Sequence, residues 1–233
     1  MTHAHPLDRP VWSALTGERQ SHLALGDARA LRFDPAYALF AVARDAAAET
    51  LAALARLIPE DGVVGLVEAG EVPLPPGVPM RQAACVQMTA QSLTAGGADI
   101  AFEALGDADA ADMLALATLT EPGPFFEKTH RLGDFIGVKQ DGRLVAMAGE
   151  RMKPDGFTEV SGVCTHLDWR GRGYAAALMR VVTSRILARG ETAFLHAYAA
   201  NEGTISLYQS LGFAVRTPVT FTVLGAAAVP GHG

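Results

Sequence analysis

The chain of 233 residues carries a net charge of −6, with 49% hydrophobic and 19% charged residues, a composition typical of soluble globular proteins. An acidic total argues against general nucleic-acid binding, which requires a basic face, although a local basic patch is compatible with it. No apolar run reaches the roughly 18 residues of a membrane span, and residues 1–6 lack the basic-then-apolar layout of a signal peptide. We therefore expect a cytoplasmic protein with neither a membrane nor a nucleic acid as partner.

The first 97 residues follow a coarse strand–helix–strand pattern. The predicted elements are a helix over 11–25, short strands over 31–33 and 37–43, a helix over 45–58, and strands over 63–68 and 81–88. Their apolar periodicity requires a core, for which the candidates are Trp12, Phe33, Phe40, Leu51 and Leu54. The Gly-containing stretch over 92–98 is the best boundary in the chain, so we predict domains over 1–97 and 98–233.

Further elements are predicted in the second segment, residues 98–233. They are a strand over 100–105, helices over 107–120 and 125–132, a hairpin of 135–140 and 144–152, a strand over 157–165, a helix over 174–188, a strand over 191–198, a helix that Asn201 caps, and a last strand pair ending at Leu224. Asp141-Gly142 is a strong two-residue signal for the hairpin turn.

The most informative stretch is Arg170-Gly171-Arg172-Gly173-Tyr174-Ala175, between the strand over 157–165 and the helix over 174–188. The first turn of a helix has free N–H groups and partial positive charge. Glycines let the backbone approach an anion closely, and arginines add charge-assisted hydrogen bonds to phosphate. The spacing differs from a Walker A loop, which ends in Gly-Lys-Ser/Thr, and from the dinucleotide fingerprint, because Ala176 replaces the third glycine. A plain Arg/Gly-rich surface turn is the alternative.

The pattern Arg170…Gly173…Ala175 resembles the pyrophosphate loop of the GNAT superfamily of N-acetyltransferases, and a second signature follows about thirty residues later. Asn201…Leu207-Tyr208…Gly212-Phe213 is similar to the family's Asn…Leu-Tyr…Gly-Phe segment. The resemblance covers residues 98–225 and implies an α/β (α+β) fold, a mixed and mostly antiparallel sheet flanked by helices. Residues 1–97 would then be either a degenerate second GNAT-like unit or an accessory lobe.

The resemblance implies an N-acyltransferase, most simply one that transfers acetyl directly from acetyl-CoA, as cosubstrate, to a primary amine in a ternary complex. The acceptor would be a small molecule or a peptide, and a homodimer is compatible with the sequence. Backbone groups at Val163 and Thr165 would bond the pantetheine arm, and Asn201 would bond it from the other side or act only as a helix cap. The pyrophosphate would be held by Arg170, Gly171, Arg172, Gly173, Tyr174 and Ala175.

Two residues are candidates for the proton transfers. Glu159 lies where several GNAT enzymes place a general base, and shielding from water would raise its pKa; a salt-bridged structural glutamate is the alternative. Tyr208 matches the tyrosine that protonates the leaving thiolate in many members, with a core aromatic as the alternative. A non-catalytic acyl-CoA-binding or regulatory module remains the rival to the enzyme.

Other chemistry-bearing residues have simpler structural interpretations. His130 and His196 could each face the substrate, and Phe125 and Phe126 could shape an acceptor pocket or pack in the core. The two cysteines, Cys85 and Cys164, have no metal-binding spacing and lie in apolar runs, so we expect buried free thiols and no metal site.

Overall fold

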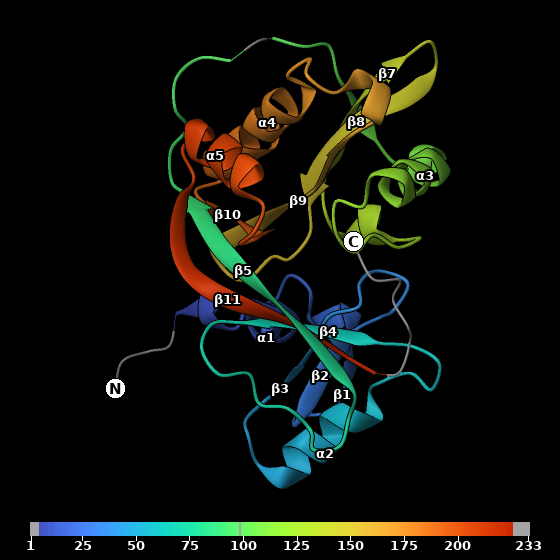
Figure 1. Cartoon of the computed structure of the whole chain (residues 1–233), viewed down its shortest axis with the longest axis vertical. Coiled ribbons are helices and arrows are strands. Elements are labelled where there is room, and N and C mark those ends of the chain that lie inside the picture. The colour runs from blue at the N-terminus through green and yellow to red at the C-terminus, as the bar shows by residue number, and fades with distance from the viewer. Residues whose placement is uncertain (1–4, 98, 226–233) are drawn as a thin grey trace.

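The computed structural model describes residues 5–97 and 99–225. The chain forms an eight-stranded sheet in the order β4-β11-β5-β10-β9-β8-β7-β6 and a separate three-stranded sheet in the order β1-β2-β3 (Figure 1). In the large sheet β9 and β10 run parallel, whereas the other neighbouring strands run antiparallel. The expected mixed, mostly antiparallel sheet flanked by helices is therefore confirmed.

The elements before residue 98 are short, apart from β5. They are the 3₁₀ turn Pro6–Asp8, α1 (Pro10–Thr16), the 3₁₀ turn Ser21–Leu23, β1 (Ala24–Gly26), β2 (Ala30–Phe33), β3 (Ala41–Ala43), α2 (Ala48–Arg56), β4 (Val64–Glu68) and β5 (Met80–Ala90). Phe33, Phe40 and Leu54 are buried as expected, while Trp12 and Leu51 pack at the margins of the core.

The elements after residue 98 follow the predicted order closely. They are β6 (Glu103–Leu105), the 3₁₀ turn Asp107–Asp109, α3 (Ala110–Thr120), the 3₁₀ turn Thr129–Leu132, β7 (Phe135–Gln140), β8 (Arg143–Glu150), β9 (Phe157–Thr165), the 3₁₀ turn Leu167–Trp169, α4 (Tyr174–Ala188), β10 (Thr192–Tyr198), α5 (Glu202–Leu211) and β11 (Ala214–Leu224). None of the helices in the described part of the chain is long and apolar enough to cross a bilayer.

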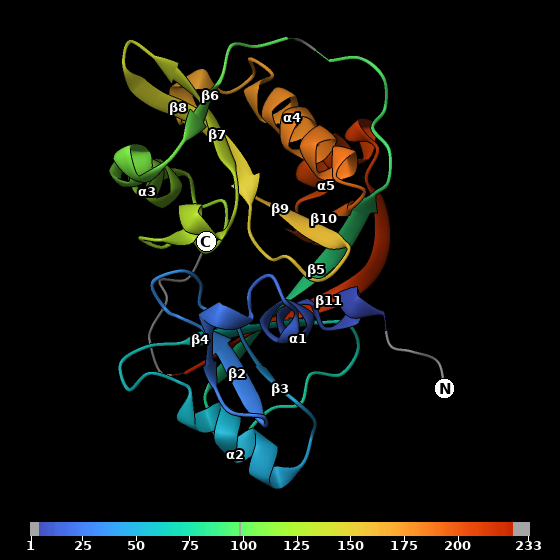
Figure 2. The same ribbon diagram turned by 180° about the vertical axis from the view of Figure 1, so that it is seen from behind.

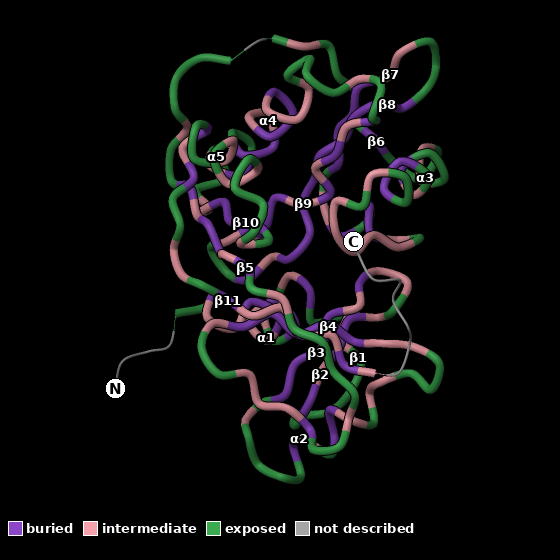
Figure 3. Tube along the Cα trace, viewed as in Figure 1, coloured by how far each residue is buried: buried purple, intermediate pink, exposed green. Residues whose placement is uncertain are grey.

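Helices cover both faces of the β6–β9 half of the large sheet. Figures 1 and 2 show α4 and α5 on one side of it and α3 on the other. Successive residues of a strand point to opposite faces, and on β7 Phe135 packs in the cluster of α3 whereas Ile136 packs in the cluster of α4. The buried parts of the chain accordingly follow the strands and the inner faces of these helices (Figure 3).

Strand β5 joins the two segments of the chain. Although it precedes the predicted boundary at 97/98, it lies between β10 and β11, pairing with β10 over Cys85–Ala90 and with β11 over Met80–Thr89. Strand β4, also from the first segment, pairs with the outer side of β11. The predicted boundary therefore falls between strands of one continuous sheet, and the remaining elements of the first segment form the lower part of the molecule in Figure 1.

Cleavage within residues 91–97 is therefore expected to leave the two fragments associated. This segment is exposed except at Leu93, so a protease can reach it. β5 should remain held by its ladders to β10 and β11, and the fragments should elute together in native size-exclusion chromatography and separate in denaturant. Separation of the fragments without denaturant would contradict the continuous sheet.

Several predicted elements were wrong in extent; the strands over 37–43 and 100–105, for example, are reduced to β3 (Ala41–Ala43) and β6 (Glu103–Leu105). The helix over 11–25 ends at Thr16. Gln20 lies beyond it and is buried, with its side-chain amide donating to Arg151 O at 2.7 Å and accepting from Lys153 N at 2.8 Å. The helix over 125–132 is reduced to the 3₁₀ turn Thr129–Leu132. The last strand pair is one long strand, β11, because its neighbours in the sheet, β4 and β5, come from the first segment.

Candidate active site

The parallel strands β9 and β10 separate at Glu159. They pair only where Phe157–Glu159 of β9 lies beside Thr192–Phe194 of β10. Beyond this point β9 pairs with β8 alone, and β10 pairs with β5 alone. The edge of β9 that faces β10 is therefore unpaired from Val160 onward, and the divergence is visible from both sides of the molecule (Figures 1 and 2). Unpaired strand edges offer backbone donors and acceptors to an extended ligand.

A bulge lies on β9 within this divergence. Opposite the single residue Ala148, β9 has the two residues Gly162 and Val163, and Gly162 has φ +63°. A Cβ at Gly162 would lie 2.8 Å from the Phe135 ring, so both the conformation and the space favour glycine. Bulges redirect backbone groups out of the ladder and are frequent at active sites. This bulge was not predicted, although an isolated glycine in a strand pattern is its signal.

A cavity of about 580 Å³ occupies the gap between β9 and β10. Its walls come from β9, from the loop before α4, from α5, from the end of α3 and from the first segment of the chain. The residues that line it include Phe40, Val67, Cys85, Glu121, Arg151, Glu159, Val163, Thr165, residues 170–175, His196, Tyr198, Asn201, Tyr208 and Phe221. Phe125, Phe126 and His130 do not line it; Phe125 packs edge-on against Phe135, and His130 bonds Asp107 at 2.8 Å.

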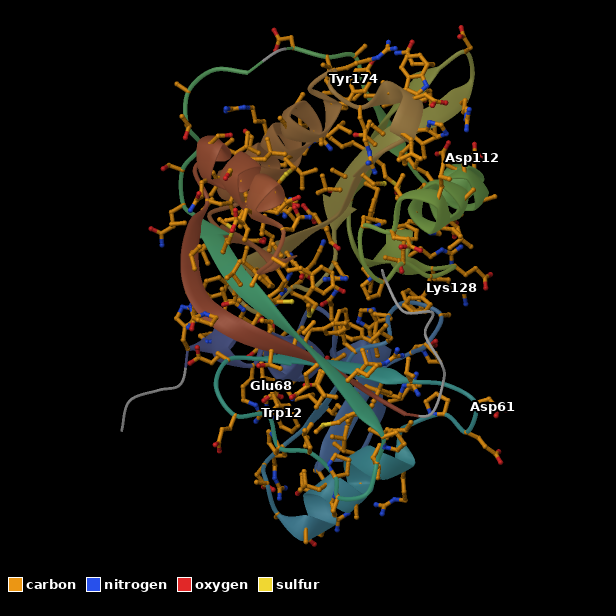
Figure 4. All side chains as sticks on the ribbon, in the orientation of Figure 1. Trp12, Asp61, Glu68, Asp112, Lys128 and Tyr174 are labelled. Carbon is orange, nitrogen blue, oxygen red and sulfur yellow. The ribbon has the colours of Figure 1, made fainter. Side chains whose placement is uncertain are left out.

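The loop before α4 has the geometry of an anion site. Gly171 and Gly173 have φ +77° and +79°, and α4 begins at Tyr174 with no side-chain cap and no acidic residue in its first turn. Arg170 and Arg172 are exposed, and the Arg172 guanidinium stacks 4.3 Å from the centre of the Trp169 ring. In Figure 4 Tyr174 lies near the top of the molecule, whereas Trp12 and Glu68 lie in its lower half. This end of the cavity is therefore positively charged and open to backbone approach.

Each side of the gap has a polar side-chain group that is available to a ligand, from Asn201 on α5 and from Thr165 on β9. Asn201 caps α5 through its side-chain oxygen, which accepts from Thr204 N at 3.2 Å, so its amide nitrogen is left for other contacts. The hydroxyl of Thr165 is buried and has no hydrogen-bond partner among the described residues. A buried hydroxyl without a partner is costly, which points to a ligand group beside Thr165.

Tyr208 lines the cavity from α5 and is largely buried. Burial raises the pKa of its phenol to about 12, so it remains protonated throughout the physiological range. It packs near Phe213, with ring centres 6.3 Å apart. The ring therefore packs against the core, and the residue also lines the cavity.

Glu159 differs from its expected electrostatics. Its carboxylate is fully buried and forms two 2.8 Å hydrogen bonds with Arg151, through Nε and Nη2, and a third of 2.8 Å with His196 Nδ1. Burial alone would raise the pKa of Glu159, but the Arg151 charge and these hydrogen bonds outweigh it and lower the pKa to about 2. The expected rise in pKa was wrong because Arg151 and His196 converge on this carboxylate, which no local sequence pattern indicates.

A chain of hydrogen bonds fixes His196. Arg216 Nη1 donates to Gln87 Oε1 at 2.8 Å, which orients the Gln87 amide, and Gln87 Nε2 lies 2.8 Å from Leu7 O and 3.1 Å from His196 Nε2. Since Gln87 offers donors there, His196 Nε2 acts as the acceptor and Nδ1 as the donor to Glu159. Both ring nitrogens are thus engaged by structural partners on β5 and β9.

Replacement of Glu159 by glutamine is expected to destabilise the fold by about 3 kcal/mol or more at pH 7, because it leaves a buried guanidinium uncompensated. The pKa of Glu159 is depressed in the fold, so its stabilisation is present above its unfolded value of 4.5 and is lost as pH falls toward about 2. Urea unfolding of both proteins at pH 7, 5, 4 and 3.5 should therefore show a difference that shrinks below pH 4.5.

The exposed Glu60→Gln variant is the control and should unfold like the parent protein at each pH. A Glu159→Gln protein as stable as the parent at pH 7 would show that the carboxylate is not held by Arg151. A difference that grows on acidification would mean that the pKa of Glu159 is raised.

Comparisons with known proteins agree with this geometry. The family model described as FR47-like protein matches residues 135–222, which include β7 to β10, the anion loop and α5. None of the curated proteins matches the chain. A crystal structure of a GNAT-family acetyltransferase from Novosphingobium aromaticivorans is similar with 47% sequence identity and a TM-score of 0.89, over 97% of this chain and 100% of that one.

Two more distant structures share the fold. A GCN5-related N-acetyltransferase from Kribbella flavida is 16% identical with a TM-score of 0.65 over 96% of each chain. A GNAT-family acetyltransferase from Colwellia psychrerythraea is 14% identical with a TM-score of 0.51, over 64% of this chain and 57% of that one. The identity and coverage of the Novosphingobium match, together with the divergent β9 and β10 and the anion loop, lead to one assignment: this chain belongs to the GNAT superfamily of acetyltransferases.

Proposed function

We propose that the protein is an N-acetyltransferase that moves an acetyl group from acetyl-CoA directly to a primary amine. The observation that carries the proposal is the continuous cavity of about 580 Å³ that joins the anion loop at α4 to the unpaired edge of β9. Such a cavity can hold an extended thioester with its phosphates at one end and its acyl group near the point where the strands meet.

The chain offers suitable partners along this path. The backbone N–H groups of the first turn of α4 and the side chains of Arg170 and Arg172 would hold the pyrophosphate. The edge of β9 at Val163 and Thr165 would pair with the amides of the pantetheine arm, and the free amide nitrogen of Asn201 would bond it from α5. When bound, acetyl-CoA supplies an activated acyl group and a thiolate leaving group.

Two groups of the protein would then act on the developing charges. A backbone N–H of the Gly162–Val163 bulge would donate to the acyl oxygen as negative charge grows on it. Tyr208, protonated because burial raises its pKa to about 12, would donate its proton to the departing sulfur. Both interactions strengthen along the reaction, which is the condition for raising kcat.

Glu159 would position other groups and would not itself take the proton of the amine. A carboxylate with a pKa of about 2 that is bonded to Arg151 and His196 is a weak base at neutral pH. The amine would lose its proton to water in the cavity, and Glu159 would orient Arg151 and His196 along the acceptor side. The catalytic assignment of Glu159 is thereby replaced with a positioning role.

Acetyl transfer can be tested by thiol release from acetyl-CoA with a panel of primary amines, and mass spectrometry would identify the N-acetylated product. The proposal expects CoA release that depends on the amine and is stoichiometric with product. Tight binding of acetyl-CoA with no transfer to any amine would support the non-catalytic acyl-CoA-binding module, and absence of binding would contradict both.

A further inference from the structure

We propose that the acceptor is a small molecule that carries a primary amine, an apolar group and a carboxylate, such as a free amino acid with an apolar side chain. The first segment of the chain would form the wall that selects it, and Arg151 would bind its carboxylate. This inference rests on the proposed acetyl transfer and assigns a function to residues that precede the predicted boundary.

The part of the cavity away from the anion loop is available for the acceptor. It is bounded by Phe40, Val67, Cys85, Tyr198 and Phe221, which we call the acceptor wall. On the sheet Val67 pairs with Phe221, and Cys85 pairs with Tyr198. Strands β4, β11 and β5, which carry Val67, Phe221 and Cys85, lie on the opposite side of β10 from β9. A thioester that lies along β9 therefore leaves the acceptor wall uncovered.

The acceptor wall is apolar and packed. Phe40 and Phe221 meet edge to face with ring centres 6.2 Å apart, and Phe40, Val67 and Cys85 are buried. Burial raises the pKa of the Cys85 thiol to about 11, so Cys85 contributes an uncharged surface. A surface of this kind favours an aliphatic or aromatic group on the acceptor, because burying that group removes apolar area from water.

Arg151 supplies an unused donor in the same cavity. Its side chain is 9% exposed, Nε and Nη2 are both bonded to Glu159, and Nη1 makes no hydrogen bond among the described residues. The guanidinium lies 4.7 Å from the centre of the Phe40 ring, which holds it against the acceptor wall. Since Arg151 lines the cavity, its open N–H can donate to a group bound there, and a substrate carboxylate would accept that hydrogen bond with charge assistance.

The charges of the cavity disfavour a polycationic acceptor. Among the described residues that line it, only Glu121 and Glu159 are acidic, and both carboxylate oxygens of Glu159 already accept hydrogen bonds from Arg151, one of them also from His196. A polyamine or a lysine-rich peptide would therefore enter without the carboxylates that its second and third ammonium groups need.

The substrate prediction can be tested with matched amines. We expect kcat/KM for leucine and phenylalanine to exceed that for 3-methylbutylamine and phenethylamine, which lack only the carboxylate, by at least about tenfold. Spermidine should be a poorer substrate than any of the four. Spermidine or the decarboxylated amines reacting as well as the amino acids would overturn the acceptor assignment and leave acetyl transfer intact. No transfer to any amine would overturn the proposed function as well.

Tyr198 allows the charge argument to be tested by a variant. It lies on β10, is 49% exposed, and lines the same cavity as Arg151. Burial raises the pKa of the Tyr198 phenol, and the positive charge of Arg151 opposes that rise. Tyr198→Glu would place a carboxylate beside Arg151 and should reduce kcat/KM for leucine at least about tenfold relative to Tyr198→Gln, while affecting phenethylamine less.

Val215→Glu, on an exposed position of β11 that does not line the cavity, controls for the added charge and should leave leucine turnover unchanged. Equal leucine turnover in Tyr198→Glu and Tyr198→Gln would overturn the assignment of a carboxylate subsite at Arg151. A reduction in Tyr198→Glu of the same size for leucine and for phenethylamine would overturn it too, because the loss would then not depend on the substrate carboxylate.

Discussion

Replacement of Gly173 by glutamate is expected to reduce acetyl-CoA binding at least about a hundredfold. A carboxylate about 4 Å from a phosphate near a protein surface costs about 4 kcal/mol, and a factor of ten in affinity is 1.4 kcal/mol. Gly173 precedes the first turn of α4 with φ +79°, so the new side chain would also strain the backbone that presents the N–H groups. Isothermal titration calorimetry with CoA and acetyl-CoA measures the loss directly.

Gly190 offers a matched control for the strain. It follows the other end of α4 with φ +78°, it is exposed, and a Cβ there would meet open space, as at Gly173. Gly190→Glu should therefore lower stability comparably and leave CoA affinity near that of the parent protein. Unchanged affinity in Gly173→Glu would show that the loop is only a surface turn, and an equal loss in both variants would point to general destabilisation of α4.

Tyr208→Phe is expected to lower kcat about ten- to a thousandfold with little change in acetyl-CoA affinity. The substitution removes one oxygen and keeps the ring that packs near Phe213. The loss should appear in kcat because the hydroxyl matters mainly when charge develops on the sulfur. Single-turnover kinetics with a saturating amine would separate the chemical step from product release.

Tyr37→Phe provides the control for loss of a phenol hydroxyl. Tyr37 does not line the cavity, and the phenylalanine ring can keep the contact that the Tyr37 ring makes with Lys128. This variant should retain the chemical rate of the parent. A wild-type single-turnover rate in Tyr208→Phe would leave Tyr208 as a core residue and require another proton donor.

The strand, loop and helix at the anion site could be predicted from the sequence because their signals are local. The β-rich run to Thr165, the glycines before Tyr174 and the helical periodicity to Ala188 coincide with β9, the loop and α4. The same holds for Asn201, whose capping hydrogen bond to Thr204 N is present, and for the Asp141-Gly142 turn, where both residues have positive φ.

The partners of distant segments could not be predicted in this way. Nothing within β5 indicates that it enters the sheet between β10 and β11, because strand pairing depends on which edges are free in the folded chain. The same limit applies to Glu159, whose pKa depends on Arg151 and His196 across the sheet. Phe40 and Val67 contribute to the cavity only through this long-range pairing.

A crystal structure of the protein with bound CoA would test the central claim most directly. The pyrophosphate should lie on the first turn of α4 beside Arg170 and Arg172. The pantetheine arm should lie in the gap between β9 and β10, along Val163 and Thr165. The thiol should lie near Tyr208, with the acceptor wall uncovered. CoA bound outside this gap, or with its phosphates away from α4, would contradict the account.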